Sequence, residues 1–194
     1  MTRVFIGGSR SVTRLDADVA RRLDAIMAKG HGVLIGDANG ADKAVQQYLH
    51  AHGYAKVEVF CTEGRCRNNV GQWPIRTVDA GRKRRGFQYY AAKDRCMASE
   101  ASAGLMIWDG TSAGTLANVA RLACQGKTVT LRIVSHLKSI RLCIVSDLKS
   151  VSLSSEPDWQ RFVVGCPVAA RERVESELKA EKAGLGSETQ TSLF

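Results

Sequence analysis

Short apolar runs alternate with longer segments of helical periodicity over the first two thirds of the chain. Apolar runs bounded by glycine or polar residues predict buried strands at 4–8, 32–36, 56–61, 104–108 and 127–133. Between them, apolar residues recur every three to four positions, which predicts helices over 15–29, 42–52, 86–103 and 115–125. Strands that alternate with helices are typical of a parallel sheet with right-handed crossovers. We therefore expect an α/β protein, a Rossmann-like three-layer sandwich with a mostly parallel sheet.

The pattern changes after residue 135. The segment 133–139 is nearly repeated at 144–150, and we interpret this duplication as a strand hairpin or meander at the edge of the sheet. One helix is expected to begin near Pro157 and another to run over 167–182. The predicted organisation is a Rossmann-like core at 1–135, a strand and helix extension of the same domain at 136–183, and a flexible tail at 184–194.

The segment 62–81 has no clear periodicity and contains several glycines, so it is predicted to be a long loop. Long loops at the carboxyl edge of a parallel sheet often contact ligands. We interpret this loop as a lid in which Trp73 stacks on a base and Arg67 pairs with a phosphate. The alternative is an exposed loop whose tryptophan packs back onto the core.

The composition is that of one globular domain. Of the 194 residues, 44% are hydrophobic and 24% are charged. No apolar run approaches the ~20 residues needed to span a bilayer, and the first residues resemble a strand rather than a signal peptide. We therefore expect a cytoplasmic protein without a membrane partner.

The cysteines show no pattern of a disulfide framework or a zinc site. None of the six is in a C-x-x-C pair or at zinc-finger spacing from a histidine. Disulfides are also uncommon in a chain of this size that lacks an export signal. We predict free thiols and no metal site. Because Cys61 and Cys66 flank a glycine loop, a redox or metal role there is kept as an alternative.

Positive charge is concentrated in one segment. The net charge is +9, and residues 65–95 contain nine Lys or Arg against two acidic residues, including the run Arg82-Lys83-Arg84-Arg85. Such a concentration is typical of proteins that bind polyanions, either phosphates or nucleic acid. The run is therefore a candidate nucleic-acid contact, and the alternative is a solvated basic loop.

Three glycine-containing turns, at 7–11, 36–42 and 109–115, each connect a predicted strand to a predicted helix. In a parallel sheet these turns lie together at the carboxyl edge, where ligands bind and where the N–H groups of helix N-termini favour anions. The third turn has two glycines and three hydroxyl side chains, which makes it the most specific of the three. Asp42 in the second turn could instead cap its helix.

Four motifs, in order, resemble the SLOG superfamily: Gly7-Gly8-Ser9-Arg10, Gly36-x-Ala38-x-Gly40-Ala41-Asp42, Lys93-Asp94-x-x-Met97 and Asp109-Gly110-x-Ser112-x-Gly114-Thr115. This superfamily includes the DNA-processing protein DprA and the LOG phosphoribohydrolases, and the resemblance spans residues 3–132. It implies a Rossmann-like protein that binds a nucleotide or a nucleotide-derived ligand, as a sensor or ligand-binding protein. Related proteins often assemble, so a homo-oligomer is expected. No cofactor other than a nucleotide ligand is expected.

The candidate ligand-binding residues come from the three turns, the predicted lid and two predicted helices. They are Gly7, Gly8, Ser9, Arg10, Gly36, Asp37, Ala38, Gly40, Asp42, Arg67, Trp73, Lys93, Asp109, Gly110, Thr111, Ser112, Gly114, Thr115 and Asn118. We expect a phosphate across the loops of Ser9 and Gly114, with Lys93 and Arg10 balancing its charge.

The alternative function is that of an enzyme, a nucleotide N-glycosidase or phosphoribohydrolase. In the LOG hydrolases a glutamate follows the Gly-Thr motif by three residues, whereas Asn118 stands at that position here. An amide cannot act as a carboxylate does at the ribosyl centre. Asp37, Asp94 and Asp109 are the remaining candidates for the catalytic carboxylate, and the sequence does not choose among them.

A further alternative is a DprA-like protein associated with nucleic acid. The last five residues resemble the pentapeptide with which bacterial proteins bind the sliding clamp. In that interpretation Leu193 and Phe194 fill an apolar groove on the clamp and Gln190 anchors the peptide by hydrogen bonds. The opposing interpretation is the end of a disordered tail.

Overall fold

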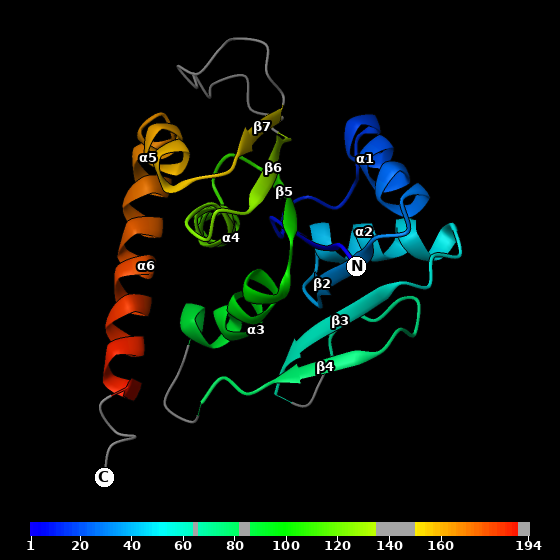
Figure 1. The fold of residues 1–194 in the computed structure, drawn as a ribbon, viewed down its shortest axis with the longest axis horizontal. Helices are drawn as coiled ribbons and strands as arrows, with labels where there is room; N and C mark the ends of the chain where they lie inside the picture. Colours follow the sequence, from blue (N-terminus) through cyan, green and yellow to red (C-terminus); the bar gives the residue numbers. More distant parts are fainter. Residues whose placement is uncertain (64–65, 82–85, 135–149, 190–194) are drawn as a thin grey trace.

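The fold is described from a computed structural model. The described residues are 1–63, 66–81, 86–134 and 150–189, with side chains up to residue 183. Over these ranges the chain forms one seven-stranded sheet with the order β4-β3-β2-β1-β5-β6-β7 (Figure 1). The strands are β1 Arg3–Gly8, β2 Gly32–Gly36, β3 Val57–Thr62, β4 Ile75–Val78, β5 Ala103–Trp108, β6 Thr128–Ile133 and β7 Ser150–Leu153. The first six pair in parallel, and β7 pairs antiparallel with β6.

Helices cover both faces of this sheet. The first two, α1 Ala17–Ala28 and α2 Ala41–Ala51, lie on one face, and α3 Gly86–Glu100 and α4 Ala113–Ala123 lie on the other (Figure 1). The last two, α5 Glu156–Val164 and α6 Val168–Thr189, pack on α4. The predicted Rossmann-like three-layer α/β architecture is confirmed.

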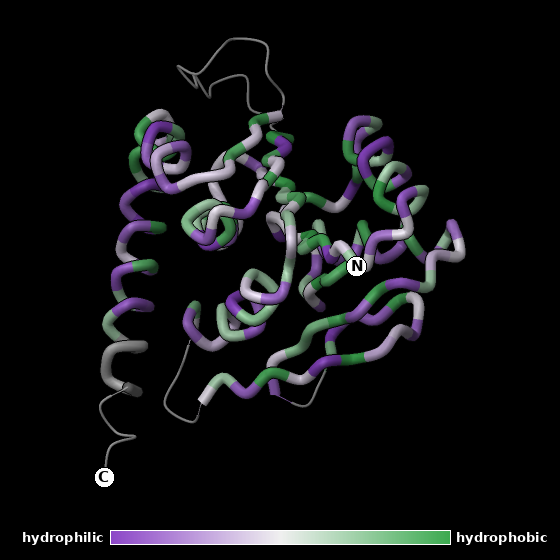
Figure 2. The backbone as a smooth tube through the Cα atoms, in the orientation of Figure 1, coloured by the Kyte–Doolittle hydropathy of each residue, from purple (hydrophilic) through white to green (hydrophobic). Residues whose placement is uncertain are grey.

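Each face of the sheet has its own hydrophobic core because side chains alternate along a strand. In β1, Val4 and Ile6 pack with α1 and α2, whereas Phe5 packs with α3 and α4. The central strands are buried on both faces, as parallel sheets require. Figure 2 shows these strands as largely hydrophobic, whereas α6 alternates between hydrophilic and hydrophobic residues because only one of its sides meets the core.

Two segments differ from the sequence prediction. The predicted long loop over 62–81 contains the edge strand β4, a short strand with little hydrophobic signal because its side chains are mostly exposed. At the other end, α6 continues to Thr189, so six residues of the expected flexible tail are helical. The predicted hairpin lies mostly in 135–149, outside the described residues, and only its two ends, in β6 and β7, are seen. No helix in the described part of the chain is long and apolar enough to cross a membrane.

Candidate functional site

A cavity opens at the carboxyl edge of the sheet, where the connections after β1 and β5 turn to opposite faces. This topological switch leaves a crevice between the two loops. The cavity has a volume of about 600 Å³, and α3, α4 and α6 also contribute to its wall. The predicted residues that line it are Gly7, Gly8, Arg10, Ala38, Asp42, Arg67, Lys93, Asp94, Asp109, Thr111, Ser112, Gly114, Thr115 and Asn118.

The loop before α4 is held in shape by Asp109 and Ser112. Asp109 Oδ1 accepts hydrogen bonds from the backbone of Thr111 (2.9 Å) and Ser112 (2.8 Å), and its Oδ2 accepts one from Ser11 Oγ (2.5 Å). Partial burial opposes ionisation of Asp109, but these hydrogen bonds hold its pKa below the usual value. Ser112 is the N-cap of α4, and its hydroxyl accepts from the backbone N–H of Thr115. Asp109 therefore organises the loop as an Asx turn.

The first turn of α4 is open to the cavity. The backbone N–H groups of Ala113 and Gly114 are in this turn and have no acceptor within the helix. A Cβ atom added at Gly114 would meet no neighbouring atom closer than 3.7 Å. Ala113 and Gly114 both line the cavity, so the positive end of the helix dipole is exposed to a ligand there.

Lys93 lies buried in the cavity wall among carboxylates. Only 4% of the residue is exposed, and its Nζ is 2.9 Å from Asp94 Oδ1 and 4.0 Å from Asp37 Oδ1. Burial opposes the charged form, but the carboxylates of Asp94, Asp42 and Asp37 raise the pKa of Lys93 above its usual value. Lys93 is therefore a buried, charged ammonium group at the cavity.

Asp42 is the second acid of this cluster. Burial raises the pKa of its carboxyl to about 6, against the opposing effect of Lys93. The N-cap of α2 is Gly40, whereas Asp42 Oδ2 accepts from the backbone N–H of Ala38 in the preceding loop at 3.2 Å. A Cβ atom at Gly36 would come within 2.5 Å of both Asp42 Oδ2 and Lys93 Nζ. Gly36 lies outside the cavity wall, but its missing side chain leaves the room for this buried pair.

Asp37 is held by Arg67 rather than presented to the main cavity. Arg67 Nε and its backbone N–H donate to Asp37 Oδ2 (2.9 and 3.1 Å), and Arg67 NH2 donates to Oδ1 (2.7 Å). Burial opposes ionisation, but Arg67 and Lys93 lower the pKa of Asp37. The guanidinium groups of Arg67 and Arg10 lie 5.1 and 5.3 Å from the centre of the Tyr90 ring. Asp37 thus orients an arginine at the mouth of the cavity.

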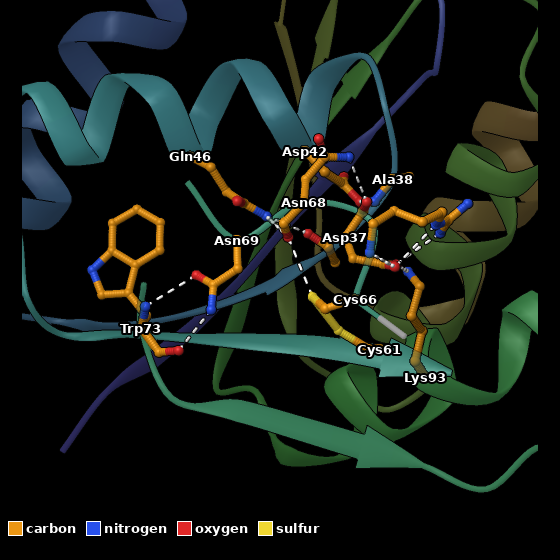
Figure 3. The surroundings of a disulfide bond; sticks show 12 residues. Asp37, Ala38, Asp42, Gln46, Cys61, Cys66, Asn68, Asn69, Trp73 and Lys93 are labelled. Atoms are coloured by element: carbon orange, nitrogen blue, oxygen red, sulfur yellow. Dashed lines mark hydrogen bonds and ion pairs between the residues drawn. A yellow bond between two sulfur atoms is a disulfide. The ribbon is translucent and has the colours of Figure 1, made fainter. Parts of the chain in front are cut away.

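Several predicted site residues lie behind or away from the cavity wall. They are Ser9, Gly36, Asp37, Gly40, Gly110 and Trp73. Ser9 joins the two loops, since its buried Oγ lies 3.2 Å from Thr115 Oγ1 and accepts from Asp109 N. Trp73 is only 8% exposed, packs in the core on the side of α1 and α2, and donates from Nε1 to Tyr54 O. Figure 3 shows it well apart from Asp37 and Lys93, so the tryptophan belongs to the core.

The sequence reasoning missed lining residues on α3 and α6. Phe87, Tyr90 and Met97 line the cavity from α3, and Arg173 reaches it from α6. The α3 residues share one helix face with Lys93 and Asp94, and this periodicity was a usable signal. Nothing in the sequence marks Arg173, because its position depends on how α6 packs on α4.

The prediction of free thiols is wrong for two cysteines. Cys61 and Cys66 form a disulfide, with their Cα atoms 5.3 Å apart (Figure 3). Cys61 is the penultimate residue of β3, and Cys66 directly precedes Arg67, whose backbone and side chain contact Asp37. Asp37 is near both sulfurs, but two sulfurs joined to each other are not available as thiolate ligands. Cys96, Cys124 and Cys166 are free, and Cys143 lies outside the described residues.

Two predicted partner sites cannot be placed, because the basic run 82–85 and the terminal pentapeptide 190–194 lie outside the described residues. The chemistry of the cavity is therefore the basis for assigning a function. In comparison with known proteins, no family model matches this chain and no curated protein matches it.

Proposed function

We propose that the chain is a SLOG-type protein that binds a nucleotide or nucleotide-derived ligand at the carboxyl edge of its sheet, as a sensor or ligand-binding protein. The observation that carries this proposal is the pairing of an open helix N-terminus with unpaired positive charge in one cavity. The N–H groups of Ala113 and Gly114 suit a phosphate. The hydroxyl groups of Thr111 and Thr115 add donors beside them.

The arginines at the mouth of the cavity support an anionic ligand. Arg10 and Arg173 both line the cavity, and within the described part of the chain neither forms an ion pair. Lys93, by contrast, is balanced by Asp94 and Asp42. A lysine whose charge is balanced by carboxylates attracts an anion only weakly. The net attraction for a phosphate therefore comes from the guanidinium groups of Arg10 and Arg173, which have no ion-pair partner among the described residues, and from the helix dipole.

The test uses a charge placed at the helix N-terminus. Gly114→Asp directs a carboxylate toward the phosphate position, whereas Gly114→Asn is its neutral control of the same size. Neither is crowded, and an acidic residue in the first turn favours the helix. We expect Gly114→Asp to weaken the binding of AMP or ribose 5-phosphate by about tenfold or more relative to Gly114→Asn in calorimetric titrations. Equal affinities in the two variants would contradict a phosphate at α4.

A specific observation favours hydrolysis of an N-glycosidic bond as a second candidate. Asp94 lines the cavity, and its Oδ2 accepts from Asn118 Nδ2 at 3.2 Å. Its carboxylate is therefore next to the position that resembles the LOG glutamate. Asp109 is committed to its loop and Asp37 to Arg67, which leaves Asp94 as the best placed of the three candidates. Burial opposes its ionisation, but Lys93 and Arg121 lower the pKa of Asp94.

In this candidate reaction Asp94 would stabilise the positive charge that develops at the ribosyl carbon. Asp42, whose pKa is about 6, would give a proton to the departing base near neutral pH, and water would add to the ribosyl carbon as the C–N bond breaks. Incubation with nucleoside monophosphates and chromatography of the free base tests this. Base release by the wild type that is lost in Asp94→Asn supports the enzyme, and no release above background removes it while leaving ligand binding intact.

A further inference from the structure

A second, smaller hollow adjoins the main cavity at the carboxyl ends of β2 and β3. It has a volume of about 180 Å³, and its wall is made by Asp37, Thr62, Glu63, Arg67, Tyr89 and Tyr90. Arg67 and Tyr90 also line the main cavity, so the two spaces share a wall. A volume of this kind accommodates one nucleobase but not a whole nucleotide.

The hollow contains a buried hydroxyl group that lacks a partner. Thr62 is 8% exposed, and its Oγ1 makes no hydrogen bond to any described residue. Buried hydroxyl groups are nearly always paired, because desolvation without a hydrogen bond is unfavourable. Thr62 also follows the apolar residues of β3, where a valine would serve the fold at least as well. The Thr62 hydroxyl is therefore available to pair with a group that enters the hollow.

The wall of the hollow also carries two carboxylates, which are hydrogen-bond acceptors. Asp37 Oδ1 accepts one hydrogen bond, from Arg67 NH2, which leaves capacity for another donor. The pKa of Tyr89 is raised above its usual value, mainly by loss of solvent around its hydroxyl group. The neighbouring carboxylate of Glu63 raises it further. Tyr89 and Tyr90 add two aromatic rings whose centroids are 5.2 Å apart. Aromatic rings together with acceptors suit a planar heterocycle that carries N–H donors.

Tyr90 and Arg67 link the two spaces. The Tyr90 ring lies under the guanidinium groups of both Arg10 and Arg67, at the shared wall. A ligand with its phosphate in the main cavity would pass these cations before its other end enters the hollow. The protein therefore offers contacts for an anion first and aromatic rings with carboxylates second. A nucleotide carries a phosphate and a base in the same order.

We infer that this hollow is the subsite for the base of the ligand, with the amino-bearing edge of a nucleobase meeting Thr62 and Asp37. The inference rests on the proposed function, because it takes the phosphate to lie at α4. Adenine, cytosine and guanine carry an exocyclic amino group, and uracil does not. The subsite should therefore distinguish AMP, CMP or GMP from UMP.

The test compares nucleotides with their sugar phosphate. Titration calorimetry on the full chain would use AMP, CMP, GMP, UMP and ribose 5-phosphate with the wild type, Thr62→Val and Thr62→Ser. At least one amino-bearing nucleotide is expected to bind about tenfold more tightly than ribose 5-phosphate. Thr62→Val should reduce that advantage about five- to tenfold without changing the affinity for ribose 5-phosphate, and Thr62→Ser should retain it.

Two controls separate a role in binding from a role in folding. Thr77→Val makes the same change on β4, at the residue paired with Cys61 and exposed to solvent, and should leave all affinities unchanged. Thr62→Val should unfold at the same or a higher temperature than the wild type, because it removes an unpaired buried hydroxyl. Tyr89→Leu provides a second variant that removes an aromatic ring of the hollow and should also reduce the advantage of the base.

The outcomes distinguish this inference from the proposed function. If ribose 5-phosphate binds as tightly as every nucleotide, or if Thr62→Val weakens all ligands equally, the base subsite is wrong and the phosphate site stands. If none of the five compounds binds the wild type, the proposed function and the subsite are both overturned.

Discussion

The side-chain amide of Asn118 donates a hydrogen bond of 3.2 Å to Asp94. Arg121 fixes the orientation of this amide, because its NH1 donates to Asn118 Oδ1 and the NH2 group of Asn118 then points toward Asp94. Arg121 is itself paired with Glu181 on α6, with NH2 2.5 Å from Oε2. A continuous polar chain therefore runs from the C-terminal helix to the carboxylate beside Lys93, and the extension supports the site as well as the core.

The first prediction concerns the buried ion pair at the base of this chain. Glu181→Ala leaves the Arg121 guanidinium buried without its carboxylate, so we expect a loss of about 3 kcal/mol in the free energy of unfolding. The exposed Glu175 of the same helix is the matched control, and Glu175→Ala should change stability by less than about 0.5 kcal/mol. Urea denaturation measures both. Similar small losses in the two variants would show that the pair contributes little.

The second prediction concerns the pH dependence caused by Asp42. Its carboxyl has a pKa of about 6 in the fold against its ordinary value of 3.8, so the folded state binds the proton more tightly than the unfolded chain. This group therefore stabilises the fold most below pH 3.8, and that contribution is lost as the pH rises through 6. Asp42→Asn should gain stability relative to the wild type between pH 5 and pH 8, on the order of 2 kcal/mol.

Denaturation curves at a series of pH values measure this difference. Glu175→Gln serves as the control, since it removes an exposed carboxylate from α6. Its free energy of unfolding should vary with pH as that of the wild type does. A constant difference between Asp42→Asn and the wild type from pH 5 to pH 8 would mean that Asp42 does not titrate in that range.

The third prediction concerns the disulfide between Cys61 and Cys66. It closes a short loop that leads directly into Arg67, so its reduction restores chain entropy to the unfolded state. We expect reducing agent to lower the free energy of unfolding by about 2 kcal/mol. A Cys61→Ala/Cys66→Ala double variant should show the reduced value under both conditions. Wild-type protein that is equally stable with and without reductant would argue against the bond.

The fourth prediction concerns the contribution of α6 to ligand binding. Arg173 lines the cavity and has no ion-pair partner among the described residues, so Arg173→Gln should weaken AMP binding about fivefold. Arg161→Gln is the control, because Arg161 is exposed on α5 and paired with Asp158. The effect of Arg173→Gln should shrink at high salt, where an exposed charge is screened. Unchanged affinity at low salt would remove Arg173 from the site.

The sequence by itself determined the order of the five core strands, of the helices that alternate with them and of the turns that carry the site. Runs such as 4–8 and 104–108 are apolar without interruption because both faces of a parallel strand are buried, so their pattern is visible without a structure. The turn that follows 104–108 contains Ser112, whose capping role depends on its neighbours in sequence.

Only the tertiary structure decided which of these residues act together. Whether the carboxylate of Asp37, Asp94 or Asp109 is available to a ligand depends on partners from other elements. Arg67 pairs with Asp37, Asn118 and Lys93 hold Asp94 in the cavity wall, and Ser11 with the loop before α4 binds Asp109. Contacts between elements also decide that Cys61 pairs with Cys66, that Trp73 is buried and that Arg173 lines the cavity. Contacts between distant segments arise from packing, which local periodicity does not encode.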